Sequence, residues 1–171
     1  MYKRQQYGGL GSNGLPLHPV LEEQLLLPIV QVADELRQGK TMKVAIKTQE
    51  GFFLSAAGGG GGYLFANATQ IGPNETFLLI PQGVNNEMVA IRTANRYYVS
   101  AVDGGGVTVN ARSTTIGPNE QFVFVPVRPD KASFITNRSF FLLALTTPPN
   151  VLTAYGLATG PRATFVVIPQ I

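Results

Sequence analysis

The sequence predicts an all-β protein built from three repeats of four short strands, preceded by an arm that contains one short helix. One observation is a sequence motif that occurs three times shortly after Gly-Pro, as ETFLLIP at 75–81, EQFVFVP at 120–126 and ATFVVIP at 163–169. A second is the composition, which is raised in Gly and Pro and sparse in charge, as in chains with many strands and turns. The 171 residues suffice for one ordinary domain with an extension.

The three repeats keep a fixed register over their whole length. The first and second copies are 45 residues apart, and the second and third are 43 residues apart. Two spacings that hold through entire repeats indicate internal duplication, which is the sequence signature of a repeat architecture. The matched apolar positions are Ile46, Ile91 and Phe134; Phe53, Tyr98 and Phe141; and Phe77, Phe122 and Phe165.

Each repeat divides into four strands in the same order. The first strand alternates in hydrophobicity and is followed by a polar turn with hairpin spacing. The second strand reads FFLSA, YYVSA or FFLLA, and a loop follows it that is glycine-rich in two repeats and TTPPN in the third. A third strand leads to the Gly-Pro turn, and the fourth is expected to end at Pro81, Pro126 or Pro169, because proline has no N–H to donate. Alternation places Phe53, Tyr98 and Phe141 in the core, with Phe77, Phe122 and Phe165 as matching core anchors.

Three four-stranded repeats predict a β-trefoil, in which six strands close a short barrel and three hairpins cap one end. A propeller also has four-stranded blades, but it typically needs at least four of them. The predicted domain limits are 1–41 for the arm and 42–171 for the trefoil, with repeats at 42–86, 87–130 and 131–171.

The pattern VAIKTQEGFFLSA, then GGG, then IGPNETFLLIP resembles a repeat of the fascin-like β-trefoil family. The resemblance covers about 42–171 and is specific in repeats one and two. Repeat three departs from it at Leu143, Arg162 and Ala163. Eukaryotic fascins resemble four such trefoils in tandem and bundle actin, so a single trefoil makes actin cross-linking the least favoured alternative. The resemblance implies the fold, and fold alone does not fix function.

Several function classes are disfavoured by composition. The absence of Cys excludes disulfides, thiolate catalysis and Cys-based zinc sites. His18 is the sole histidine, and no triad or metal cluster can be assembled around it, so we expect no catalytic residue, metal or cofactor. Basic residues are scattered, which argues against nucleic acid. The first residues lack the apolar core of a signal peptide, and 21–36 is too short and charged to span a membrane, so the compartment stays open, with an extracellular or surface assembly as one expectation.

Two recurrent features inside the repeats are interpreted as architecture. Glu75 and Glu120 follow Gly-Pro-Asn and are expected to accept hydrogen bonds from nearby backbone N–H groups. The glycine-rich loops precede strands, so they do not form a phosphate cradle. An alternative use is close approach of a sugar or a neighbouring chain. Tyr97 is expected to face outward and to offer a stacking surface. The candidate ligand-loop residues are Gly60, Tyr97, Gly105 and Pro149.

The arm at 1–41 lies outside the repeats and is the preferred source of function. Apolar residues at helical spacing, with Pro28 before them and Gly39 after them, predict a helix at about 29–38. Such a helix either plugs the open end of the barrel or packs on another copy, since a large apolar surface usually marks an interface. We therefore expect a non-enzymatic structural subunit that self-associates through the arm into a filament, coat or surface structure. The carbohydrate-binding module is the alternative. The predicted assembly interface comprises Leu21, Leu25, Leu26, Ile29, Val32 and Leu36.

Overall fold

Twelve antiparallel strands carry the three repeats, as the sequence predicts, in a computed structural model that describes residues 28–170. Repeat one contributes β1 (Met42–Lys47), β2 (Phe53–Ala56), β3 (Leu64–Ala68) and β4 (Phe77–Gln82). Repeat two contributes β5 (Met88–Arg92), β6 (Tyr98–Ala101), β7 (Val109–Ser113) and β8 (Phe122–Arg128). Repeat three contributes β9 (Lys131–Ile135), β10 (Phe141–Ala144), β11 (Leu152–Gly156) and β12 (Phe165–Pro169).

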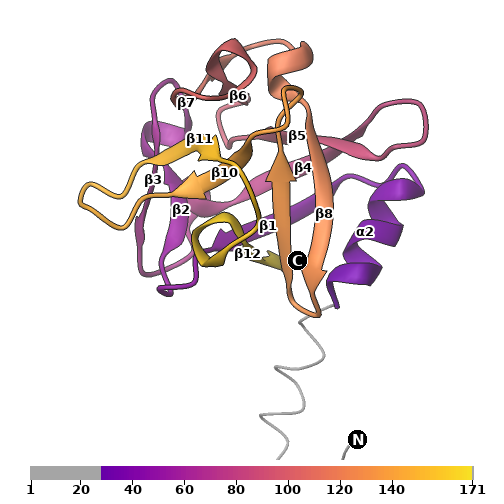
Figure 1. Ribbon diagram of the computed structural model, residues 1–171, viewed down its shortest axis with the longest axis horizontal. Coiled ribbons are helices and arrows are strands. Elements are labelled where there is room, and N and C mark those ends of the chain that lie inside the picture. The colour runs from indigo at the N-terminus through magenta and orange to yellow at the C-terminus, as the bar shows by residue number, and fades with distance from the viewer. Residues whose placement is uncertain (1–27, 171) are drawn as a thin grey trace, which may run out of the picture.

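Six of these strands close a barrel. Around the ring, β1 pairs with β4, β4 with β5, β5 with β8, β8 with β9, β9 with β12, and β12 returns to β1. The closing pair runs from Val44 opposite Pro169 to Lys47 opposite Val166. The remaining strands form the hairpins β2–β3, β6–β7 and β10–β11 (Figure 1). This arrangement confirms the β-trefoil.

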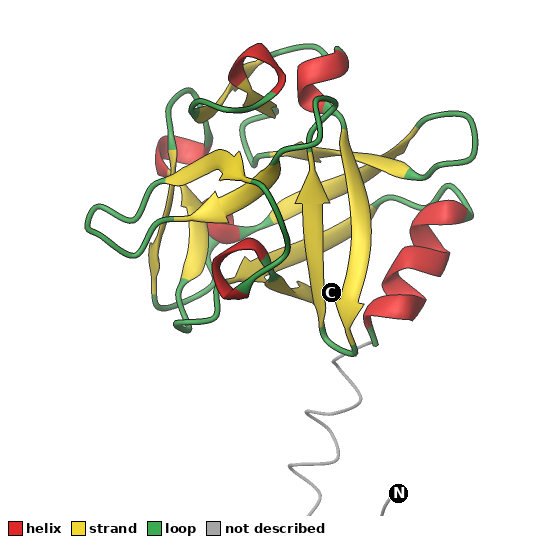
Figure 2. Ribbon diagram, viewed as in Figure 1, coloured by secondary structure: helices red, strands yellow, loops and turns green. Residues whose placement is uncertain are grey.

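Short 3₁₀ turns punctuate each repeat (Figure 2). In repeats one and two, η1 (Ala57–Gly59) and η3 (Val102–Gly104) open the glycine-rich loops. The Gly-Pro turns form η2 (Pro73–Glu75), η4 (Pro118–Glu120) and η5 (Pro161–Ala163). The recurring Gly-Pro motif therefore forms the turn that precedes the last strand of every repeat.

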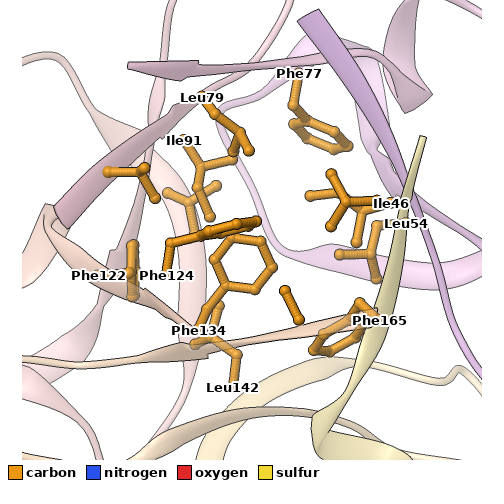
Figure 3. Close-up of a cluster of buried hydrophobic side chains, with 14 of the residues drawn as sticks. Ile46, Leu54, Phe77, Leu79, Ile91, Phe122, Phe124, Phe134, Leu142 and Phe165 are labelled. Atoms are coloured by element: carbon orange, nitrogen blue, oxygen red, sulfur yellow. The ribbon is translucent and has the colours of Figure 1, made fainter. Parts of the chain in front are cut away.

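The hydrophobic core includes one matched phenylalanine from each repeat, and Figure 3 shows these three side chains around the Phe124 and Phe134 rings. Phe77, Phe122 and Phe165 are no more than 1% exposed, which confirms them as core anchors. Phe134 packs edge-on against Phe124, with ring centroids 5.4 Å apart. Only about 10 Å³ of space remains between the apolar side chains at the centre, so the barrel interior has no room for a ligand.

Two sequence-based expectations about the strands are wrong. Phe53, Tyr98 and Phe141 are only half-buried, and the next residue along each strand faces the core instead. Those inward residues are Leu54, Val99 and Leu142. The half-buried aromatic rings make contacts on the outside of the barrel. The Lys47 ammonium, for example, lies 5.8 Å from the Phe53 ring centroid.

The second wrong expectation concerns the closing prolines. Pro169 does end β12, but β4 continues beyond Pro81 to Gln82, and β8 beyond Pro126 to Arg128. Pro81 stands opposite Val89 and Pro126 opposite Ala132 within the hairpins that connect successive repeats. These long hairpins keep their pairing on either side of a residue that lacks an N–H, so proline does not end the strand here.

The helix α2 (Ile29–Arg37) packs its apolar face onto the barrel of its own chain. Its amino end is fixed where the Ile29 N–H donates to the Pro129 carbonyl at the β8–β9 turn, at 2.9 Å. Its carboxyl end is held by the Asn86 side-chain amide of the β4–β5 turn, which donates to the Arg37 carbonyl at 3.1 Å. The helix therefore covers the barrel end away from the β2–β3 and β10–β11 hairpins (Figure 1).

Burial of α2 corrects part of the predicted assembly interface. Ile29, Val32 and Leu36 are at most 2% exposed within the single chain, so their apolar surface is not available to another copy. The other three predicted interface residues, Leu21, Leu25 and Leu26, lie outside the described residues. The helical spacing of the apolar residues is the same whether the helix packs on another copy or on its own barrel. In the structure the helix packs on its own barrel.

Leu36→Ala tests whether α2 belongs to the core. We expect it to lower the free energy of unfolding by about 2–5 kcal/mol, because it empties a closely packed apolar site. Val30→Ala is the matched control on the same helix, since Val30 is 57% exposed, and should change stability by less than about 0.5 kcal/mol. Urea unfolding followed by circular dichroism measures both, and equal small effects would show that the helix is dispensable.

Candidate binding site

The first turn of every repeat is built in the same way. A threonine side-chain oxygen accepts the N–H of the residue four positions later, which is always aromatic. The pairs are Thr48 with Phe52 at 3.2 Å, Thr93 with Tyr97 at 3.2 Å, and Thr136 with Phe140 at 3.1 Å. Phe52, Tyr97 and Phe140 therefore occupy equivalent positions, and a difference in their surroundings reports a difference between the repeats.

Between repeats one and two, the glycine-rich loop covers the turn that follows. The Asn95 amide donates to the Gly58 carbonyl at 2.6 Å, and the Asn95 N–H donates to the Gly59 carbonyl at 3.0 Å. Gly60 has φ +123°, and a Cβ there would lie 2.7 Å from Cδ2 of Tyr97. Only glycine permits both the backbone angle and this approach. Tyr97 is consequently half-buried and packed against the core.

Between repeats two and three the same contact recurs. The Thr136 hydroxyl donates to the Gly104 carbonyl at 2.6 Å, and Arg138 donates to the Asp103 carbonyl at 3.2 Å. Gly105 has φ +117°, and a Cβ there would lie 2.6 Å from the Phe140 ring. The glycine-rich loops are therefore contacts between repeats within one chain, which accounts for glycine at these positions without any ligand.

Between repeats three and one this cover is missing. Repeat three has Thr146, Thr147, Pro148 and Pro149 where the other repeats have glycines. Within residues 28–170, no hydrogen bond joins the turn at 48–52 to the loop at 145–150. The Asn150 carbonyl accepts the Ala66 N–H at 2.8 Å, as the Gly62 carbonyl accepts the Ala111 N–H in the equivalent contact. The third loop therefore keeps its contact with the neighbouring hairpin and lacks only the contact with the following turn.

A cleft of about 80 Å³ opens at this junction. Phe52 forms one wall and is 37% exposed. Glu50, on the same turn, is exposed and has no hydrogen bond or ion pair to any residue that the structure describes. Thr146 and Asn150 line the side formed by repeat three. An aromatic ring beside a free carboxylate and an amide presents one apolar surface and polar groups able to bind hydroxyls. We call this group of residues the Phe52 cleft.

Glu75 and Glu120 are part of the scaffold, as expected from the turn sequence. Each accepts the N–H of the glycine three residues earlier, Gly72 at 2.8 Å and Gly117 at 2.7 Å. Their second oxygens accept the hydroxyls of Ser55 at 2.6 Å and Ser100 at 2.5 Å, which tie the turn to the second strand. Repeat three has replaced both partners of this pair, with Ala163 and Leu143. Both glutamate oxygens are thus occupied in holding the turn.

The predicted ligand-loop residues separate into two groups. Gly60 and Gly105 contact the following turn, and Tyr97 is packed beneath the loop, which corrects its expected role as an outward stacking surface. Pro149 is exposed in the loop that borders the Phe52 cleft. Sequence reasoning missed Phe52 and Glu50. The signal in the sequence is the loss of glycine from the third loop. Because a glycine-rich loop covers the turn of the next repeat, a loop without glycine indicates that the turn at 48–52 is left uncovered.

Residues 28–170 contain no group of three or more His, Asp or Glu side chains placed to hold a metal ion. In the same part of the chain, the one α-helix is too short and insufficiently apolar to cross a membrane.

Solved structures with the same fold support the trefoil assignment. A designed threefold-symmetric protein, ThreeFoil, matches with a TM-score of 0.63 and 13% identity over 75% of this chain and 97% of its own. The BEL β-trefoil matches with a TM-score of 0.62 and 12% identity over 75% and 93%. A Polyporus squamosus lectin, bound to a human-type influenza-binding epitope, matches with a TM-score of 0.63 and 12% identity over 74% and 48%. No protein-family model and no curated protein matches the chain. At these identities the comparisons establish the β-trefoil fold and not the fascin-like family.

Gly60→Ala tests the loop-to-turn contact. We expect it to cost roughly 2–4 kcal/mol of stability, because it adds a clash with Tyr97 to a backbone angle that alanine avoids. Gly58→Ala is the control in the same loop, since Gly58 also has positive φ but nothing lies within 4 Å of its Cβ position. That variant should cost only about 1–2 kcal/mol. Thermal and urea unfolding measure the pair, and a larger loss for Gly58→Ala would refute the contact.

Proposed function

We propose that this chain is a saccharide-binding β-trefoil module that holds a sugar in the Phe52 cleft. One observation carries the proposal. Of three equivalent aromatic residues, Tyr97 and Phe140 are packed under the preceding loop, whereas Phe52 is left open beside polar groups. The three residues have the same place in their repeats, so the exposure of Phe52 does not follow from the fold itself. The two covered aromatics serve packing, so the exposed one calls for another role.

The composition of the cleft suits a sugar. A pyranose has a C–H face that packs on an aromatic ring and hydroxyls that donate to a carboxylate. Phe52 supplies the ring and Glu50 the free acceptor. Asn150 uses part of its amide on the Leu145 carbonyl, at 3.2 Å, which fixes the side chain at the rim. A cleft of about 80 Å³ accommodates a contact face of one ring and not a whole oligosaccharide.

One solved structure with this fold and the carboxylates of this chain support saccharide binding. The Polyporus squamosus protein is a lectin bound to a sialylated saccharide epitope, and it shares the trefoil fold with this chain. In this chain, the two repeated carboxylates, Glu75 and Glu120, are each engaged with a serine and a backbone N–H. Glu50 stands alone in the cleft, whereas sugar hydrolysis uses two carboxyl groups about 5–10 Å apart. A module that binds without hydrolysing fits these observations.

Self-association through the amino-terminal segment is a second proposed property. It rests on Leu21, Leu25, Leu26 and Leu27, an apolar group that directly precedes α2. The apolar face of α2 is already occupied by the barrel, so this group is additional to what the helix needs. The fascin-like resemblance and a structural role in a filament or coat belong to this same proposal.

Phe52→Ala tests the sugar site. We expect the full-length protein to bind a subset of glycans on an array, and Phe52→Ala to weaken that binding about tenfold or more through the lost apolar contact. Phe52→Tyr keeps a ring, as the equivalent Tyr97 does, and should retain binding.

Tyr63→Ala is the matched control, because Tyr63 is another exposed aromatic residue, at 41%, and does not line the cleft. It should leave glycan binding unchanged. Circular dichroism establishes that each variant is folded. Binding that survives Phe52→Ala would place the sugar elsewhere and end the proposal for this cleft.

Removal of residues 1–27 tests self-association. The cut spares α2, which packs on the barrel, and takes away the apolar group before it. Sedimentation of the full-length chain at high concentration should give a mass above that of the monomer, and the truncated chain should sediment as a monomer. A full-length chain that remains monomeric contradicts the proposal, as does a truncated chain that still associates.

A further inference from the structure

A second hollow, larger than the Phe52 cleft, lies on the outside of the barrel beside β12. It has a volume of about 370 Å³, within the range of small-molecule sites. Its walls come from three segments: the β8–β9 hairpin, the Gly-Pro turn of repeat three, and the β1–β2 turn. We call it the Arg128 pocket. The β1–β2 turn borders both sites, since Gln49 lines this pocket while Glu50 and Phe52 line the other.

The charge of the Arg128 pocket is positive. Its ionisable lining residues are Arg128 and Lys131, and no carboxylate is among the lining residues. Neither cation forms an ion pair with any acidic residue between 28 and 170, Asp130 in the intervening turn included. Gln49 and Thr159 add an exposed amide and hydroxyl, whereas the Thr164 hydroxyl is directed at the Pro161 carbonyl, at 3.4 Å. The free polar groups can therefore donate several hydrogen bonds to an anion.

The position of the two cations is unfavourable without an anion. Arg128 and Lys131 stand directly opposite each other across the β8–β9 pair. Like charges at directly opposed positions destabilise a strand pair. The matching Gly-Pro turns of repeats one and two each carry a glutamate, Glu75 or Glu120, but repeat three has Ala163 there. The Gly-Pro turn that borders the two cations is thus the one without the carboxylate that this turn carries in the other repeats.

The remaining walls favour an organic anion over a bare ion. Val127 and Pro161 contribute exposed apolar surface, which an inorganic ion would not contact. The volume also exceeds what a single sulfate or phosphate needs. We propose that the Arg128 pocket binds the acidic group of a saccharide, a sulfate or a carboxylate carried on a sugar ring. This inference rests on the proposed saccharide-binding function and assigns the charge class of its ligand.

The test compares two double variants of the full-length chain on an array of neutral, sialylated and sulfated forms of the same glycans. Arg128→Gln with Lys131→Gln removes the pocket's cations. Arg37→Gln with Lys40→Gln removes the same charge at the far end of α2, where the partners are exposed surface ion pairs to Asp34 and Glu35. We expect acidic glycans to bind at least about tenfold more tightly than their neutral forms, and the first variant alone to abolish this difference.

Each outcome decides the matter. If both double variants weaken the binding of acidic glycans equally, the glycans are attracted by the net charge of the protein. If neutral glycans bind as tightly as acidic ones, the pocket does not bind the acidic group. Either result overturns the inference. Inorganic sulfate that displaces the glycan with equal molar affinity would overturn the saccharide part. If Phe52→Ala has no effect while the Arg128 and Lys131 substitutions abolish binding, the Phe52 proposal fails and this one stands. A chain that binds no acidic glycan refutes it.

Discussion

Closure of the barrel by the β1–β12 pair is the constraint on which the other features depend. Repeats one and two, and repeats two and three, are joined by continuous hairpins, β4–β5 and β8–β9, whereas repeats three and one meet only through non-covalent pairing. With that pair formed, the three phenylalanines belong to one core, and the two glycine-rich loops reach the turns that follow them. The Phe52 cleft lies at the one junction that the chain does not cross, and the Arg128 pocket lies between that junction and the β8–β9 hairpin.

The glycine-rich loops and the helix stabilise this closed form in different ways. The loops contribute close backbone approach: a Cβ at Gly59, Gly60, Gly104 or Gly105 would fall within 3 Å of the next repeat's turn. The helix contributes apolar burial and spans from the β8–β9 turn to the β4–β5 turn through two hydrogen bonds. The apolar residues of α2 extend the core at one end of the barrel, and the repeats contain no equivalent of this helix. The asymmetry of the molecule therefore arises at both barrel ends, from α2 at one and from the third loop at the other.

Much of the fold could be predicted from the sequence, because the repeats place Phe77, Phe122 and Phe165 in one register. The orientation of the second strand could not, because FFL and YYV are apolar at three successive positions, so alternation does not show which of them faces inward. The partner of α2 could not, because its apolar spacing is the same for any partner. The Phe52 cleft was missed because it depends on contacts between repeats, such as Asn95 with Gly58, 37 residues apart.

The glutamate–serine pair has a consequence for how such a chain can change. In repeats one and two each carboxylate holds its own turn and the hydroxyl of the second strand, and in repeat three both partners are gone together. Restoring Glu alone at position 163, which is 1% exposed, would bury a carboxylate against Leu143 with no hydroxyl to meet it. Restoring Ser alone would leave a hydroxyl without its acceptor. In this chain the two residues therefore depend on each other, and a single substitution in repeat three would not restore the contact that repeats one and two share.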